Sequence, residues 1–147
     1  NVFITGMGTG GTIMGFHHYF SQKKNDFKAY PILPDKNEDG GHRIEGIGDS
    51  FIPKIVDLQA LSPILRVNDA DAINIARQIN KLGLSVGISS GANVFGAIVK
   101  AHDLKEGANV ATILCDDNKK YLSTDLCSDT VEPLSRNIKI TDFALIS

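Results

Sequence analysis

Asn1-Val-Phe-Ile-Thr-Gly-Met-Gly-Thr-Gly-Gly-Thr12 is the stretch that decides the fold of this chain. A short β-favouring run, residues 2–4, is interrupted by the glycines Gly6, Gly8, Gly10 and Gly11. A helix-like apolar pattern starts at Ile13, so the predicted order is strand, glycine loop, helix. Backbone N–H groups in such a loop can approach an anion closely, and the positive end of the helix favours negative charge. Thr9 and Thr12 add hydroxyl donors, and the stretch therefore predicts a phosphate site.

Two other interpretations of the loop stay open. Gly6 to Gly11 matches the dinucleotide pattern G-x-G-x-x-G, which expects an acidic residue about 20 positions later at the end of a second strand. Asp26 has about that spacing, but it precedes the strand-like run 27–33 instead of ending it. A Walker loop is not matched, because no lysine stands between Gly11 and Thr12. A glycine-rich turn that binds nothing is the other possibility.

Length and composition describe one soluble domain. The chain has 147 residues, 42% of them hydrophobic and 22% charged, which is enough to bury a core. The net charge is −2 and the basic residues are scattered, so we expect neither a nucleic-acid nor a membrane partner. No run approaches the length of a membrane span.

The cysteines and the first residues give expectations about compartment and completeness. Cys115 and Cys127 are too few and too far apart for a disulfide framework or a zinc site, and we expect a reducing cytoplasm. No secretory signal is visible. Since the chain starts without Met and directly on a strand, we expect a fragment of a longer protein.

A βαβ unit is predicted at the beginning of the chain. Apolar residues recur at helical spacing from Ile13, and the helix is expected to run to about Lys24. His17 and His18 are adjacent and point in different directions, so we interpret them as packing or surface residues and not as metal ligands. Residues 27–33 are the next strand, ended by prolines and parallel to the first.

The middle of the chain predicts a loop and an unusual turn. Residues 35–42 are polar and read as an exposed loop. Gly46 and Gly48 stand between apolar residues, where a regular strand does not want them. Close approach of the backbone to a ligand, a tight bend, or an ordinary buried turn would each explain them.

The second half alternates strands and helices. Residues 64–67 are a predicted strand, Asn68 caps the next helix, and Gly83 closes it. Residues 84–88 are a short buried run, after which residues 89–91 open another helix. Ser89 either caps that helix or presents its hydroxyl to a ligand. Residues 109–114 are the last strand, and residues 128–147 show no assignable pattern.

Four stretches, in order, resemble the cysteine synthase and cystathionine β-synthase family of fold type II pyridoxal-phosphate enzymes. Gly8-Thr-Gly-Gly-Thr12 is similar to the loop that cradles the cofactor phosphate. His42-Arg-Ile-Glu-Gly-Ile-Gly48 with Phe51-Ile-Pro53 resembles H-x-I-Q-G-I-G and F-I-P. Val86-Gly-Ile-Ser-Ser-Gly-Ala92 resembles V-G-I-S-S-G-A, and residues 114–126 resemble L-P-D-D-G-x-x-Y-L-S-T-x-L.

The resemblance implies a fold and a division of the chain. The expected fold class is α/β: a three-layer, open, mostly parallel twisted sheet with helices on both faces. It corresponds to the larger carboxyl-terminal lobe of a two-lobe enzyme. Residues 1–127 would be the cofactor-phosphate-binding lobe, residues 128–147 a tail of unassigned structure, and the family's amino-terminal half is absent.

The resemblance also implies a site and a reaction. Pyridoxal phosphate would be the cofactor, held at its phosphate by Gly8, Thr9, Gly10, Gly11 and Thr12. Ser89 would meet the pyridine nitrogen, and a neutral hydroxyl there tempers the ring as an electron sink, which suits β-replacement. Gly46 would line the substrate side. The implied reaction adds sulfide or a thiol to C-β of serine or O-acetylserine, in a parent enzyme that is a homodimer.

Departures from the family pattern define the alternatives. The Schiff-base lysine and the T-S-G-N-T-G loop are absent, so no catalytic residue is nominated and the chain alone should be inactive. Cys115 replaces a common proline and is expected to be an inert buried thiol, Glu45 replaces Gln, and Leu33 replaces Glu. Cysteine synthesis is favoured over cystathionine synthesis. A non-catalytic phosphate- or partner-binding module and a nucleotide-dependent oxidoreductase are the other hypotheses.

Overall fold

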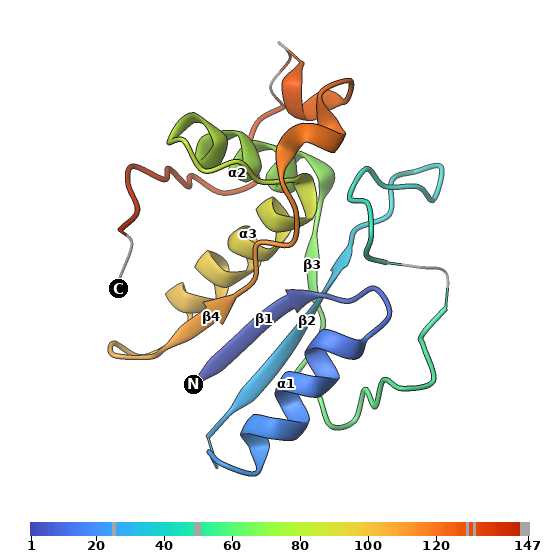
Figure 1. Ribbon diagram of the computed structural model, residues 1–147, viewed down its shortest axis with the longest axis vertical. Coiled ribbons are helices and arrows are strands. Elements are labelled where there is room, and N and C mark those ends of the chain that lie inside the picture. The colour runs from blue at the N-terminus through green and yellow to red at the C-terminus, as the bar shows by residue number, and fades with distance from the viewer. Residues whose placement is uncertain (25, 49–50, 129, 131, 145–147) are drawn as a thin grey trace.

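A computed structural model describes residues 1–24, 26–48, 51–128, 130 and 132–144. Its helices and strands, in chain order, are β1 (Val2–Gly6), α1 (Gly11–Ser21), β2 (Lys28–Pro34), β3 (Leu65–Val67), α2 (Asp69–Lys81), α3 (Ile88–His102) and β4 (Val110–Thr112). Two short 3₁₀ turns follow, η1 (Asn118–Tyr121) and η2 (Asp125–Cys127). Within the described residues the strands form one sheet in the order β3-β2-β1-β4, and every pairing is parallel (Figure 1).

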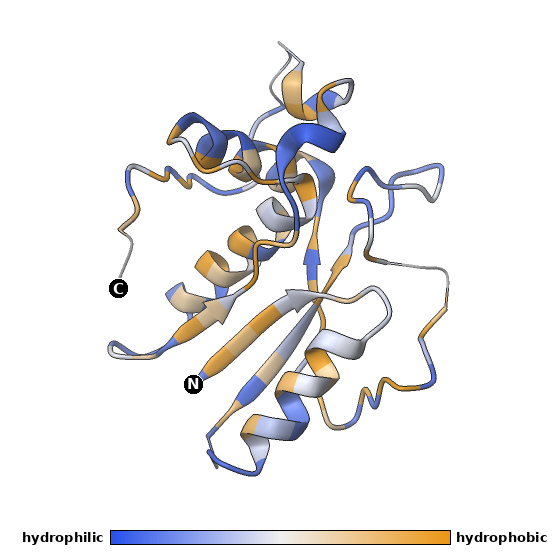
Figure 2. Cartoon of the chain, viewed as in Figure 1, coloured by the Kyte–Doolittle hydropathy of each residue, from blue (hydrophilic) through white to orange (hydrophobic). Residues whose placement is uncertain are grey.

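Helices cover both faces of this sheet, as predicted. Ile4 and Ile32 are fully buried and share one core cluster with α2 and α3. On the opposite face Ala29 packs with Ile13 of α1, and the ring of Phe3 stacks on that of Phe16 at 3.9 Å. Hydrophobic residues therefore concentrate along β1, β2 and α3 in Figure 2, whereas η1 is hydrophilic. The three-layer α/β architecture is confirmed.

The first crossover matches the prediction in order but not at its ends. The helix begins at Gly11, two residues before the predicted start, and it ends at Ser21 instead of near Lys24. The second strand is predicted over residues 27–33, and β2 begins and ends one residue later, running through Pro31 to Pro34. Ile32 accepts a hydrogen bond from Met7 beyond β1, so the missing N–H of Pro31 points toward β3, whose ladder starts only at Ile32.

The α2 boundaries follow the predicted capping chemistry. Asn68 has extended backbone, and its side chain accepts the Asp71 N–H at 2.8 Å. Gly83 has a φ of 94°, which lets the chain turn away after the last helical residue. The loop at residues 35–41 is exposed, as expected. None of the helices in the described part of the chain is long and apolar enough to cross a membrane.

The carboxyl-terminal segment has neither helix nor strand in its described residues after Ser128, yet it is attached to α2. Leu134, Ile138 and Ile140 pack against the core cluster of that face. The Ser135 N–H donates to a carboxylate oxygen of Asp71 at 2.7 Å. These contacts fix the segment along α2 without regular structure of its own.

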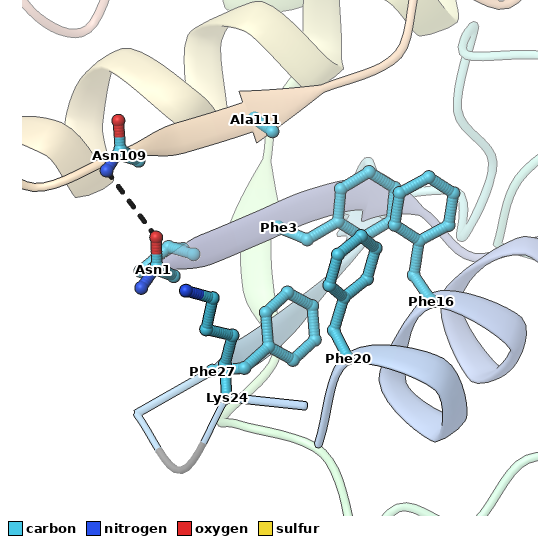
Figure 3. A pocket seen from close by; sticks show the side chains of 9 residues that line it. Asn1, Phe3, Phe16, Phe20, Lys24, Phe27, Asn109 and Ala111 are labelled. Carbon is cyan, nitrogen blue, oxygen red and sulfur yellow. Dashed lines mark hydrogen bonds between the residues drawn. The ribbon is translucent and has the colours of Figure 1, made fainter. Parts of the chain in front are cut away.

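An apolar groove lies between the α1 face and the β4 edge (Figure 3). Its volume is about 170 Å³, and Figure 3 shows Phe16, Phe20 and Phe27 facing it beside Phe3. Ala111 of β4 is exposed there, because α1 covers β1 and β2 but does not reach the edge strand.

Close packing of α2 on α3 predicts the effect of one methyl group. A Cβ added at Gly91 would lie 2.0 Å from the carbonyl oxygen of Ala72, so Gly91→Ala should lower the free energy of unfolding by about 1–3 kcal/mol. Gly15→Ala is the matched control, since a Cβ there meets nothing within 4 Å on an exposed helix position, and it should stabilise by about 0.5–1 kcal/mol. Urea unfolding measures both, and equal stability of Gly91→Ala and the unchanged chain would contradict the packing.

Candidate functional site

The glycine loop leaves a helix end open at the carboxyl edge of the sheet. Gly10 has a φ of 83°, a left-handed conformation that admits the sharp entry into α1. The first hydrogen bond of the helix runs from the Met14 N–H to the Gly10 carbonyl at 3.0 Å. The N–H groups of Gly11, Thr12 and Ile13 precede it, and no side chain caps this end in the described residues. These donors are therefore available to an anion.

A second turn presses against the loop. Gly46 and Gly48 have φ values of 80° and 79°, so the tight-bend interpretation is confirmed. A Cβ on Gly8 would lie 2.4 Å from the Gly46 carbonyl oxygen, and the Gly48 N–H donates to the Met7 carbonyl at 3.1 Å. Gly8 must lack a side chain for this contact to exist, and the positive φ of Gly46 favours glycine there. The result is a cradle in which the backbone of the two glycine segments forms part of the wall.

The cradle encloses a cavity of about 230 Å³. Of the residues predicted to bind the cofactor or substrate, the cavity is lined by Gly8, Thr9, Gly10, Thr12 and Gly46. Thr5, Ile47, Ile113 and Cys115 complete much of the wall. Gly11 starts α1 but does not face the cavity, and neither does Ser89.

Ser89 lies behind the cavity wall, at the start of α3. Gly87 is the capping residue of that helix and Ser89 its second residue, so the interpretation of Ser89 as the cap is wrong. The helix is predicted to begin at Ser89, and α3 begins one residue earlier, at Ile88. Gly87 can precede it in extended conformation against Asp116, because an added Cβ would lie 2.2 Å from the Asp116 Oδ1. The Ser90 hydroxyl accepts the Cys115 N–H at 2.8 Å. The serine pair therefore holds the residue that faces the cavity.

Cys115 is exposed, and the prediction of a buried thiol is wrong. The edge strand β4 ends at Thr112, and Cys115 follows it on the wall of the cavity. Desolvation by the surrounding protein raises the pKa of the Cys115 thiol, and the Asp116 carboxylate acts in the same direction while a hydrogen bond to Ser89 opposes them. A raised pKa keeps the thiol protonated at neutral pH, in agreement with the predicted low reactivity.

Tyr121 and Asp116 pack against Gly87, the residue that precedes α3. Burial raises the pKa of Tyr121, and the hydrogen bond that its hydroxyl donates to Asp116 at 2.8 Å raises the pKa further. The phenol is therefore a neutral donor throughout the physiological range. It fixes the acidic side chain next to Gly87 and away from the glycine loop.

Asn93 is a site residue that the sequence did not single out. It is fully buried and joins three segments: its Oδ1 accepts the Gly6 N–H at 2.7 Å, and its Nδ2 donates to the Ile113 carbonyl at 2.9 Å. Its Nδ2 also lies 3.4 Å from the Cys115 sulfur. The one local signal that marks Asn93 is a polar amide within a stretch of small and apolar helix residues, and it does not reveal these distant partners.

The direction of strands β1 and β2 contradicts the nucleotide interpretation of the glycine loop. Asp26 bonds to the amino group and side chain of Asn1, at the beginning of the parallel strands β1 and β2. The glycine loop is at the opposite end of these strands, so Asp26 cannot serve a ribose there. Among the described residues no His, Cys, Asp and Glu cluster could hold a metal, and His18 is exposed with its ring 3.3 Å from the Gln22 amide nitrogen.

The donor set fits a phosphate group. Backbone N–H groups at a helix start, the hydroxyls of Thr9 and Thr12, and the positive helix end all favour a dianion. A phosphate needs close backbone approach, which the positions without Cβ at Gly8 and Gly10 supply. The cavity also extends past the loop to Cys115, which leaves room for a group attached to the phosphate.

Comparison with known proteins agrees with this geometry. The family model of the pyridoxal-phosphate-dependent enzymes matches residues 1–116. The cysteine synthase B of Campylobacter jejuni is 40% identical over 132 residues, which are 86% of this chain and 44% of that protein. The chain thus spans less than half the length of this relative.

Solved structures share the fold at the same partial coverage. The hydrogen sulfide-producing enzyme from Fusobacterium nucleatum matches with a TM-score of 0.82 and 42% identity, over 89% of this chain and 42% of that one. The O-acetylserine-dependent cystathionine β-synthase from Helicobacter pylori matches with a TM-score of 0.75 and 32% identity, over 86% of this chain and 43% of that one.

Alkylation of the cysteines tests whether the cavity is one compartment. Because Cys115 lines the cavity with the glycine loop, pyridoxal phosphate should slow its reaction with iodoacetamide. Cys127 is exposed outside this cavity and should react at an unchanged rate, which makes it the internal control. Mass spectrometry of the two peptides at pH 9, where more thiolate is present, measures both rates. Equal protection of both cysteines, or of neither, would contradict a shared cavity.

Proposed function

This chain belongs to the family of pyridoxal-phosphate-dependent enzymes, and on that premise we propose that it is the cofactor-phosphate-binding part of a β-replacement enzyme that makes cysteine. The proposed substrates are O-acetylserine or serine, with sulfide or a thiol as the second reactant. The cavity shared by the glycine loop, the Gly46 turn and Cys115 is the observation that carries this proposal. The similarity to cysteine synthase B of Campylobacter jejuni supports the choice of reaction.

The glycine loop would hold the cofactor by its phosphate. The N–H groups at the start of α1 and the hydroxyls of Thr9 and Thr12 would donate to the phosphate oxygens, in a cradle that no side chain of Gly8 or Gly10 fills. Pyridoxal phosphate, when bound, supplies an electron sink for negative charge that develops on the amino-acid substrate. The chain's contribution is to bind this group and orient it.

Ser89 and Gly46 would serve the ring and the substrate. Ser89 lies at the start of α3 next to Ser90, whose hydroxyl accepts the N–H of the cavity residue Cys115, and we propose that the Ser89 hydroxyl meets the ring nitrogen from this side. A neutral hydroxyl leaves this nitrogen unprotonated, in contrast to a carboxylate. Gly46 would border the space that the amino acid enters, because it faces the cavity from the turn opposite α1.

A second candidate is cystathionine synthesis by the parent enzyme. The similarity to the O-acetylserine-dependent cystathionine β-synthase from Helicobacter pylori favours it, and the same part of the chain is matched in both cases. The two candidates share the cofactor and differ in the thiol that attacks. We propose in both cases that the chain alone is inactive, since it has no lysine in the family's Schiff-base context.

Binding of pyridoxal phosphate tests the proposal. The chain should bind pyridoxal phosphate at least about tenfold more tightly than pyridoxal, because charge-assisted hydrogen bonds to the phosphate contribute about 1.5–3 kcal/mol. Gly8→Ala should remove most of this difference, since its Cβ would lie 2.4 Å from the Gly46 carbonyl oxygen. Calorimetric titration measures the affinities.

Thr9→Val with Thr12→Val is a second variant that keeps the backbone, and it should weaken the cofactor's binding without lowering stability. Thr141→Val, outside the cavity lining, is its matched control. Equal affinity for pyridoxal and pyridoxal phosphate would refute the cofactor role. Cysteine formed from O-acetylserine and sulfide by the loaded chain would refute its inactivity, and phosphate binding without preference for the pyridoxal group would favour a non-catalytic module.

A further inference from the structure

Arg43 is held by carboxylates from three separate parts of the chain. Its Nε lies 3.2 Å from Asp69 at the start of α2, and its terminal nitrogens contact Asp125 of η2 and, at 2.8 Å, Glu132 of the carboxyl-terminal segment. The backbone N–H of Arg43 also donates to Asp69 at 2.8 Å. Arg43 is therefore fixed through both its backbone and its guanidinium.

The inner partner of this network is buried. The side chain of Asp69 is 3% exposed, and it also accepts a hydrogen bond from the Asn37 side chain at 3.2 Å. Its place in the first turn of α2 adds stabilisation by the helix dipole. Removing the arginine would leave a buried carboxylate without its cation, which is far more unfavourable than loss of a surface pair.

Arg43 directly precedes the turn that forms a wall of the cavity. Ile44 is fully buried after it, Gly46 faces the cavity, and Gly48 bonds to Met7 beyond β1. The turn thus has two anchors, one at each end. Between them Ile44 and Ile47 are buried in the core, whereas Glu45 is exposed and Gly46 has a left-handed conformation, so the Glu45-Gly46 tip has little rigidity of its own.

The side of the turn that bears His42 and Glu45 is not closely packed. A second cavity of about 300 Å³ lies there, lined by His42, Arg43, Glu45, Ile88, Tyr121, Thr124 and Asp125. Space of this size lets the turn move away from the glycine loop if its anchor is lost. The ion pairs of Arg43 therefore add a positional role to the core contacts of Ile44 and Ile47.

We propose that Arg43 is a positioning residue that holds the Gly46 turn against the glycine loop and so sets the width of the cofactor cavity. This inference rests on the proposed function, because it assigns the turn a part in holding the cofactor. The proposed phosphate donors lie in the glycine loop and at the start of α1, which packs on β1 and β2. Loss of Arg43 should thus weaken binding of the whole cofactor while inorganic phosphate binds almost as before.

The test compares two ligands in the 147-residue chain. Arg43→Met should raise the Kd of pyridoxal phosphate about tenfold and that of inorganic phosphate less than about twofold. Arg43→Lys, which keeps the charge but loses the planar fork, should restore part of the affinity. Arg66→Met is the matched control, since Arg66 is exposed, donates to the Pro34 carbonyl and lines neither cavity. It should leave both Kd values unchanged.

Hydrogen exchange separates failure of this inference from failure of the proposed function. The Gly48 N–H should exchange faster in Arg43→Met and not in Arg66→Met, whether or not the cofactor binds. Unchanged exchange of Gly48, or equal weakening of both ligands, would overturn the positioning role. If the unchanged chain does not prefer pyridoxal phosphate to phosphate, the proposed function fails, and faster exchange then still supports the anchor of the turn.

Discussion

The contact between the Gly46 carbonyl and Gly8 is the constraint on which the site depends. The glycine loop after β1 and the turn at Gly46 approach so closely that a single methyl group at Gly8 would collide with the Gly46 carbonyl oxygen. Such an approach leaves peptide groups on the cavity surface beside the hydroxyls of Thr9 and Thr12. A doubly charged group can then be bound by several short hydrogen bonds from the backbone. A glycine-built cradle thus suits a phosphate in a chain whose net charge is −2.

The three long helices use their amino-terminal ends differently. The first turn of α2 contains Asp69 and Asp71, so its positive end is already compensated by the chain's own carboxylates. The first turns of α1 and α3 contain no acidic residue. α1 follows β1 directly, and the start of α3 bonds through Ser90 to Cys115, which lines the same cavity as the glycine loop. The uncompensated start of α1 therefore lies at the proposed cofactor position, and that of α3 lies behind the cavity wall.

The sequence predicted the elements whose signals are local. The glycines at the start of α1, the cap at Asn68 and the turn at Gly83 depend on neighbouring residues, and each was found where expected. Residues whose role depends on distant partners were missed. Asn93 joins β1 to the residues after β4, and Arg43 meets Glu132 across 89 positions, so neither has a neighbour in sequence that reveals its role. The burial of Cys115 was misjudged for the same reason, because exposure beside an open sheet edge is a property of the assembled layers.

A crystal structure of the chain grown with pyridoxal phosphate tests the central claim most directly. The account predicts phosphate oxygens within about 2.7–3.2 Å of the N–H groups at the start of α1, with the ring directed toward Cys115 and the side of Ser89. Phosphate density at any other place, such as the apolar groove beside Phe3, with the glycine cradle left to solvent, would contradict it.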